Sequence, residues 1–102
     1  NFLPLKIRNL SATRKRPALV LANLEAEDLV ICEITSRIRE DNYVVSLENK
    51  DLDSGSLRTK SIIRPNRLLT VKKKTINYKF GKIKPAKLEE VFSKLKAVFR
   101  LR

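Results

Sequence analysis

The sequence predicts a mainly β protein of about five to six short antiparallel strands, followed by one C-terminal amphipathic helix. Two patterns carry this prediction. Short apolar, often β-branched runs recur between polar turns, and only the last segment changes to a helical period. Because the expected strands are short and irregularly spaced, we expect a small, strongly bent sheet or barrel. The 102 residues suit one domain over 1–102.

The first half of the chain predicts a hairpin. Residues 1–17 are polar and basic and are expected to form a loop that ends at Pro17, which lacks an amide hydrogen and marks the start of a strand. The strand at 18–22 is wholly apolar. The polar stretch 23–28 then connects it to a second strand at 29–35.

Further strands are expected in the second half, with turns at 51–56, where Gly55 can take a positive φ, and at the three lysines of 72–74. Pro65-Asn66 is expected to interrupt one strand, and Gly81 to close another. The expected strands cover residues 43–47, 61–64, 68–71 and 75–80.

The last segment predicts a helix that begins near Pro85, a residue suited to the first helical turn. Its apolar residues are spaced at i, i+3, i+4, i+7, i+10 and i+11 and form one stripe. We expect this stripe to be core, packed on the sheet or on a partner subunit, and to have no catalytic role. It consists of Leu88, Val91, Phe92, Leu95, Val98 and Phe99.

The charge is large and unevenly distributed. The chain has 23 basic and 11 acidic residues, a net charge of +12. Residues 1–60 contain ten basic and nine acidic side chains, whereas residues 61–102 contain thirteen basic and two acidic ones. This asymmetry indicates a polyanionic partner, either a nucleic acid or an acidic protein.

The composition also excludes several kinds of chemistry. The chain has no histidine and a single cysteine, Cys32, so a zinc site and an internal disulfide are not expected. The acidic group Glu25, Glu27 and Asp28 is explained by a turn as well as by a magnesium site. No apolar stretch approaches the roughly 20 residues of a membrane span. We expect a cytoplasmic protein with no cofactor and no membrane partner.

The stretch LVICEITSR at 29–37 changes character along one face of its expected strand. One face stays apolar through Val30, Cys32 and Ile34, whereas the other begins with Leu29 and Ile31 and continues as Glu33, Thr35 and Arg37. The second face therefore begins over a core and ends in a polar place, either a groove or open solvent. A hydroxyl on the end of a rigid strand suits a group that must hold a ligand atom.

Four ordered segments resemble the PemK/MazF family of type II toxin–antitoxin ribonucleases over residues 11–102. They are KRPALVLAN, DLVICEITSR, GSLRTKSIIRPNRLLTV and GKIKPAKLEEVFSKLKAVF. The resemblance implies a small SH3-like β-barrel of the PemK/CcdB-like kind, working as a homodimer. It also implies metal-independent, sequence-specific cleavage of single-stranded RNA, inhibition by a cognate antitoxin, and a DNA-binding toxin–antitoxin complex.

The resemblance also implies the site residues. The catalytic arginine of the family's Arg-Pro motif matches Arg16, and its strand-ending threonine matches Thr35. Some members use an arginine and, two residues later, an acid; here these are Arg64 and Asn66, so a carboxylate base at that position is in doubt. The expected RNA-binding residues are Arg14, Lys15, Ser36, Arg37, Ser61, Arg64, Asn66 and Arg67.

Members of the family usually open with a Gly-Asp-Ile-Val-type strand, which this chain lacks, so that strand is expected upstream of residue 1. A barrel truly without it would have an open edge and a damaged fold.

The implied reaction is attack of an RNA 2′-hydroxyl on its own phosphate. Arg16 would hold phosphate oxygens, and Thr35 would donate to a non-bridging oxygen. Proton transfer could involve Glu33, another acid near the groove, or water; Glu33 could instead form an ion pair with Arg37 or Arg16. Two other functions fit the charge: a non-catalytic basic barrel that binds RNA or protein, and a toxin of the same fold that poisons a DNA topoisomerase.

Overall fold

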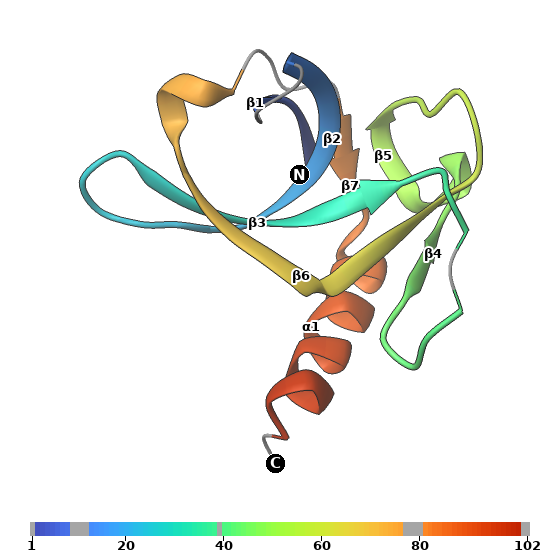
Figure 1. The fold of residues 1–102 in the computed structure, drawn as a ribbon. Coiled ribbons are helices and arrows are strands. Elements are labelled where there is room, and N and C mark those ends of the chain that lie inside the picture. Colours follow the sequence, from blue (N-terminus) through green and yellow to red (C-terminus); the bar gives the residue numbers. More distant parts are fainter. Residues whose placement is uncertain (1, 9–12, 39, 77–80, 101–102) are drawn as a thin grey trace.

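The structure is a computed structural model that describes residues 2–8, 13–38, 40–76 and 81–100, with side chains from Pro17 onward. In these ranges one antiparallel sheet has the strand order β4-β6-β3-β2-β1-β7-β5 and curls into a half-barrel, with helix α1 below it (Figure 1). The strands are β1 Phe2–Arg8, β2 Thr13–Asn23, β3 Asp28–Thr35, β4 Val45–Leu47, β5 Leu52–Gly55, β6 Ser61–Lys72 and β7 Gly81–Ile83, and the helix is α1 Pro85–Phe99. The mainly β prediction with a C-terminal helix is confirmed, with seven strands in these ranges instead of five to six.

The hairpin expected from the first half is confirmed. Strands β2 and β3 pair antiparallel, with Leu19 opposite Cys32 and Ala18 opposite Glu33. Their connecting turn has positive φ at Ala26 (58°) and Glu27 (69°). A positive φ is sterically unfavourable for residues with a Cβ. The pairing of β2 with β3 therefore holds this tight turn in place.

The prediction that residues 1–17 form a loop is wrong. Residues 2–8 form β1, and β2 begins at Thr13, four residues before the expected start at Pro17. Strand β1 pairs with β2 from Phe2 to Arg8 and meets β7 through Phe2 and Gly81. The family's usual opening strand, expected upstream of residue 1, stays a prediction.

The prediction that Pro65-Asn66 interrupts a strand is also wrong, because β6 runs from Ser61 to Lys72. Its register with β3 passes from Arg64 opposite Glu33 to Leu68 opposite Cys32, which leaves residues 65–67 as a bulge. A bulge needs no ladder donor from the proline, so the missing N–H has no cost there. Strand β6 is sharply bent along its course (Figure 1).

The remaining β segments differ from the prediction in their bounds. The strand expected at 43–47 is β4, and the turn expected at 51–56 contains β5, which ends at Gly55 with a φ of 81°. The lysine turn is a 3₁₀ turn over Lys73–Thr75. Of the strand expected at 75–80, residues 77–80 lie outside the described part of the chain, and Gly81 begins β7 instead of closing a strand.

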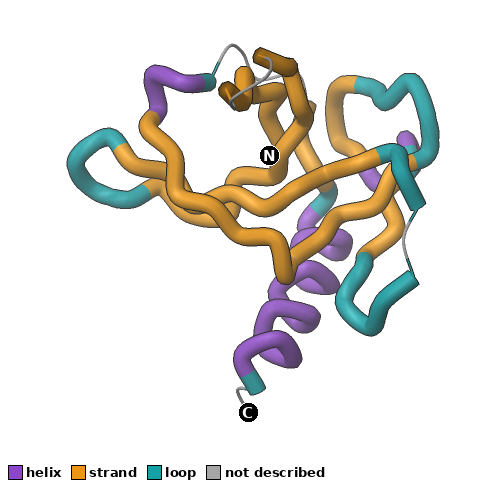
Figure 2. Tube along the Cα trace, viewed as in Figure 1, coloured by secondary structure: helices purple, strands orange, loops and turns teal. Residues whose placement is uncertain are grey.

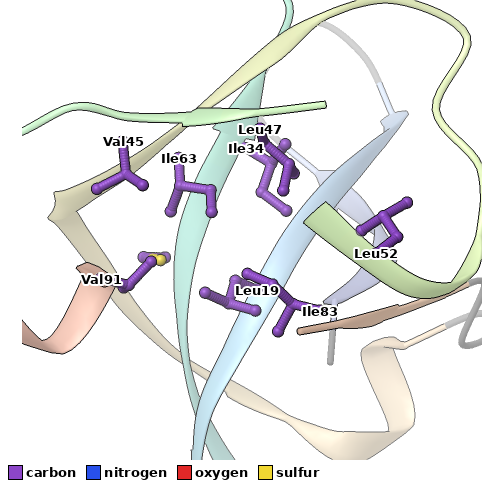
Figure 3. Packing of buried hydrophobic residues seen from close by; sticks show 9 residues of the cluster. Leu19, Ile34, Val45, Leu47, Leu52, Ile63, Ile83 and Val91 are labelled. Atoms are coloured by element: carbon purple, nitrogen blue, oxygen red, sulfur yellow. The ribbon is translucent and has the colours of Figure 1, made fainter. Parts of the chain in front are cut away.

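The main core lies between the curled sheet and α1 (Figure 2). Side chains from the six strands β2 to β7 form this core with Val91 of the helix, and they point toward one another in Figure 3. Cys32 and Ile34 belong to this cluster, whereas Leu29 and Ile31 belong to a smaller cluster on the other face of β3. The two faces predicted for LVICEITSR are therefore observed over this strand.

Helix α1 confirms the predicted helix, with Pro85 in its first turn and Arg100 in the left-handed conformation after its end. Val91 is fully buried, and Leu88 and Leu95 pack against the core. The two phenylalanines of the stripe are not packed on the sheet, because Phe92 is 40% exposed and Phe99 is 56% exposed in the single chain. For these two residues, the expected packing on a partner subunit stays a prediction. In the single chain, one side of the helix therefore has an exposed aromatic surface, which we call the aromatic flank.

Candidate active site

The end of β3 holds a hydroxyl in a fixed position. Thr35 is the last residue of the strand and is half-buried. Its Oγ1 accepts a hydrogen bond of 3.1 Å from the backbone N–H of Arg37. This local turn ends the strand and restrains the side chain. Because a hydroxyl has one donor hydrogen as well as its acceptor lone pairs, the Thr35 O–H can still donate to a ligand.

A charged cluster lies on the same face of β3. Glu33 is opposite Arg64 of β6, and its carboxylate lies 3.6 Å from Arg64 Nη1 and 3.8 Å from Arg67 Nε. The β6 bulge lies between these two arginines and lets both reach one carboxylate. Within the described side chains, the expected ion pair of Glu33 with Arg37 is not formed.

Asp41, in the loop after β3, is a site residue that the sequence reasoning missed. Its Oδ1 accepts hydrogen bonds from the backbone N–H groups of Tyr43 (2.8 Å) and Val44 (3.0 Å), and its Oδ2 lies 3.8 Å from Arg64 Nη2. Asp41 and Asn42 directly precede the strand expected at 43–47, and an Asp-Asn pair is typical of a turn. The sequence could therefore have indicated that Asp41 accepts hydrogen bonds from the backbone. The contact with Arg64 depends on tertiary structure.

Arg64 is the centre of this cluster. Its side chain is 13% exposed and lies between two carboxylates at distances longer than hydrogen bonds. Among the described side chains, its Nε is the one buried polar atom without a hydrogen-bond partner. Such an unsatisfied donor costs about 1–3 kcal/mol, and functional sites are one setting that accounts for it.

The backbone of Arg16 approaches this region from β2. The β2–β3 ladder reaches Ala18 opposite Glu33, and Arg16 and Thr35 each lie two residues beyond that pair in their own strands. Both residues therefore lie at the same end of the ladder. The side chains of Arg14, Lys15 and Arg16 lie outside the described part of the structure.

The other expected site residues have distinct surroundings. Ser36 and Arg37 are exposed just after β3, and Asn66 is exposed on the β6 bulge. Arg67 joins the charged cluster through Glu33, with its side chain 62% exposed. Ser61 is buried, and its hydroxyl donates to the Thr59 carbonyl oxygen at 3.2 Å, so this hydroxyl serves the fold.

Cys32 lies next to Glu33 in sequence but is fully buried in the main core. Burial, with a smaller contribution from the Glu33 charge, raises the pKa of its thiol from 9.0 to about 12. The thiol is therefore neutral at physiological pH and is not a nucleophile of this site.

The described residues contain no group of three or more acidic, cysteine or histidine side chains that could hold a metal ion. Helix α1 is too short and too polar to cross a membrane, and the described residues contain no other helix that could do so.

The half-barrel of antiparallel strands with a C-terminal helix is a MazF-like fold. Residues 5–99 match the family described as the PemK-like, MazF-like toxin of type II toxin–antitoxin systems, and the chain belongs to this family. No curated protein sequence matches the chain.

Several solved structures share the fold. A Mycobacterium tuberculosis toxin, MazF-mt6, is 17% identical, with 97% of this chain and 98% of that chain covered and a TM-score of 0.75. The toxin–antitoxin structure MazE-MazF from Deinococcus radiodurans gives 19% identity, coverage of 99% and 94%, and a TM-score of 0.81. An endoribonuclease in complex with its cognate antitoxin, from a mycobacterial species, is 15% identical, with 99% of this chain and 92% of that chain covered and a TM-score of 0.73.

Proposed function

We propose that this chain is the toxin of a type II toxin–antitoxin system and that it cuts single-stranded RNA by attack of a 2′-hydroxyl on the adjacent phosphate. Family membership supports the toxin role. The observation that carries the catalytic proposal is the restrained hydroxyl of Thr35, beside a charged cluster that contains two arginines.

In the proposed reaction, the 2′-oxygen forms a bond to phosphorus while the bond to the leaving 5′-oxygen breaks. The products are a 2′,3′-cyclic phosphate and a 5′-hydroxyl. The nucleophile is part of the substrate, so the protein mainly has to align the groups and stabilise the charge that develops on the phosphate. The Thr35 O–H donates to a non-bridging oxygen in this proposal, since its Oγ1 is held by the Arg37 amide.

Arg16 is assigned to the phosphate because a guanidinium presents several donors in a planar fork that matches phosphate oxygens. Arg64 has a second role. Its ion pairs with Glu33 and Asp41 are 3.6 and 3.8 Å long, so a phosphate can compete with the carboxylates for this guanidinium. The proposal involves no metal ion, since guanidinium groups supply the positive charge.

Proton transfer is assigned to Glu33. Its side chain is 28% exposed and lies on the same face of β3 as Thr35, two residues away, a separation of about 7 Å along a strand. A phosphate held by Thr35 therefore lies within reach of this carboxylate. In the proposal, Glu33 accepts the 2′-hydroxyl proton, and a protonated group or water supplies the proton to the leaving oxygen.

We also propose three features of the cellular context. The toxin is cytoplasmic, as its substrate requires, and a cognate antitoxin holds it inactive. Two antitoxin pairs support this assignment: the mycobacterial endoribonuclease and the MazF of Deinococcus radiodurans were each crystallised with the antitoxin. The working unit is a homodimer, for which the exposed Phe92 and Phe99 of α1 supply an apolar contact surface.

The test is cleavage of a mixed single-stranded RNA pool by the purified protein in the presence of a chelator. Thr35→Ala removes one donor and is expected to lower the rate by about 10²–10³. Arg16→Ala is expected to lose most of the activity. Thr70→Ala, which removes an exposed hydroxyl from the far part of β6, and Lys82→Ala, which removes an exposed cation from β7, are the matched controls and should cut at the wild-type rate.

The outcomes separate the competing functions. RNA binding without any cleavage would support a non-catalytic basic barrel, and DNA breaks with intact RNA would support a topoisomerase poison. Wild-type cleavage by both Arg16→Ala and Thr35→Ala would overturn the assignment of these residues.

A further inference from the structure

A polar pocket outside the site just described lies where the 3₁₀ turn Asn49–Asp51 faces the loop between β5 and β6. Its volume is about 290 Å³. This is close to the lower end of the range for small-molecule sites. Its lining residues are Glu48, Asn49, Lys50, Leu57, Arg58, Thr59 and Lys60.

The pocket is next to the end of β3. Lys60 directly precedes β6, and within the first residues of β6 Ile62 is opposite Thr35 on one side and Ser46 on the other. Lys60 is two residues before Ile62, the residue opposite Thr35, and two residues span about 7 Å along a strand. The backbone of Lys60 therefore lies a short distance beyond the end of β3. In Figure 1 the end of β3, the start of β6 and the β5–β6 loop lie on the same side of the molecule. One extended RNA strand can therefore reach both places.

The rim of the pocket is fixed by a side-chain clamp. Asn49 Oδ1 accepts a 2.6 Å hydrogen bond from the Leu57 backbone N–H, and Asn49 Nδ2 donates to the Leu57 carbonyl oxygen at 3.4 Å. Leu57 in turn packs against the main core. The wall of the pocket is therefore preorganised, which lowers the ordering cost of binding.

The charges of the lining favour an anion. Three cations and one carboxylate give the lining a net charge of +2. The ion pairs of Glu48 with Lys50 and Lys60 are 3.8 and 3.9 Å long, and both lysine side chains are well exposed. Such pairs contribute little and are readily exchanged for a phosphate. Leu57 supplies apolar surface for a base, and Glu48 can accept a hydrogen bond from a base amino group.

We propose that this pocket binds one nucleotide of the substrate RNA that flanks the cleaved bond, with its phosphate on Arg58 and Lys60. The inference rests on the proposed RNA-cleaving function and extends it to a second subsite. Asn49 is a positioning residue of this subsite, because it acts through the Leu57 backbone.

The test measures binding of a mixed-sequence RNA in which every 2′-hydroxyl is methylated, so that it cannot be cut by the proposed reaction. The double variant Arg58→Ala/Lys60→Ala is compared with Lys82→Ala/Lys84→Ala, which removes the same charge from exposed positions at β7. Because the proposal places one phosphate on the two cations, the slope of log affinity against log salt is expected to fall by about 0.7 for the pocket variant, the value for one phosphate contact on a single strand, and to stay unchanged for the control.

An equal loss in both double variants would overturn the proposal, since it would mean that only the general positive field matters. An NMR titration with the same RNA gives a second readout that does not depend on a mutation. The Leu57 and Thr59 amide signals should shift during the titration, and unshifted signals would contradict binding in this pocket.

Failure of the nuclease proposal and failure of this inference give different results. RNA that stays uncut but binds through Arg58 and Lys60 would refute the nuclease and support the pocket. RNA that is cut normally by the Arg58→Ala/Lys60→Ala variant, at wild-type KM, would support the nuclease and refute the pocket.

Discussion

At the scale of single residues, the two carboxylates near Arg64 differ in what they are bonded to. Asp41 uses one oxygen to accept two backbone N–H groups of its own loop and the other to face Arg64, so the loop backbone fixes the position of this carboxylate. The Glu33 carboxylate has only long ion pairs with Arg64 and Arg67. Glu33 is therefore the carboxylate with oxygens available to a substrate proton.

This difference predicts opposite outcomes for two isosteric variants. Glu33→Gln is expected to lower the cleavage rate by about 10²–10⁴, as the loss of a general base does. Asp41→Asn keeps an oxygen for the backbone N–H groups and is expected to change the rate less than about tenfold. A Glu33→Gln protein that cuts RNA at the wild-type rate would exclude the role of Glu33 as base.

The Cys32 thiol gives a prediction that tests the core independently of any activity. Because its pKa is raised to about 12 in the folded protein, it should not react with iodoacetamide at pH 8, while the unfolded protein reacts readily. In the unfolded chain the thiol ionises near 9.0, so the unfolding free energy should fall as the pH rises above 9 toward 12. Fast labelling of the native protein at pH 8 would contradict the buried position.

Several of these residue roles could be predicted from the sequence, and others could not. The alternation in LVICEITSR places Glu33 and Thr35 on one face because strand geometry has a fixed period of two. The pairing of Glu33 with Arg64 and Arg67 could not be predicted, because it depends on the register of two strands that lie far apart in sequence and on a three-residue bulge. No local sequence pattern encodes this register or this bulge.

At the scale of the elements, the errors have identifiable physical causes. The stretch FLPLKIR alternates apolar and other residues as a strand does, but the polar and basic character of the segment around residues 11–13 led to the loop prediction for all of 1–17. Pro65 suggested a break in β6 because a proline cannot donate in a ladder; at the bulge no donor is required. Helix α1, in contrast, carries a long amphipathic stripe, and its start near Pro85 was predicted correctly.

The aromatic flank of α1 predicts an association between two copies of the chain. Phe92 and Phe99 lie seven residues apart, hence on the same side of the helix, and both are exposed. Phe92→Ser/Phe99→Ser is expected to convert a dimer into a folded monomer, measured by light scattering after size-exclusion chromatography. Ala97→Ser changes an exposed position on another flank and should leave the dimer intact. A double variant that stays dimeric would place the interface elsewhere.

At the scale of the whole molecule, the net charge of +12 indicates a polyanionic partner, and the proposed RNA substrate is such a partner. Two features lie next to each other at the shared end of β3 and β6. One is the site with Thr35 and the Arg64 cluster, and the other is the polar pocket with Arg58 and Lys60. The charge asymmetry of the sequence predicts a polyanionic partner, either a nucleic acid or an acidic protein, and this stays a prediction. The adjacency of the two features is a property of the folded sheet.

The most direct test of the central claim is the chemical identity of the RNA ends after incubation with the protein in chelator. The account predicts a 2′,3′-cyclic phosphate on one fragment and a 5′-hydroxyl on the other, with at least about a hundredfold less of both when Thr35 is replaced by alanine. Intact RNA, fragments with 5′-phosphate ends, or equal yields from the Thr35→Ala protein would contradict it.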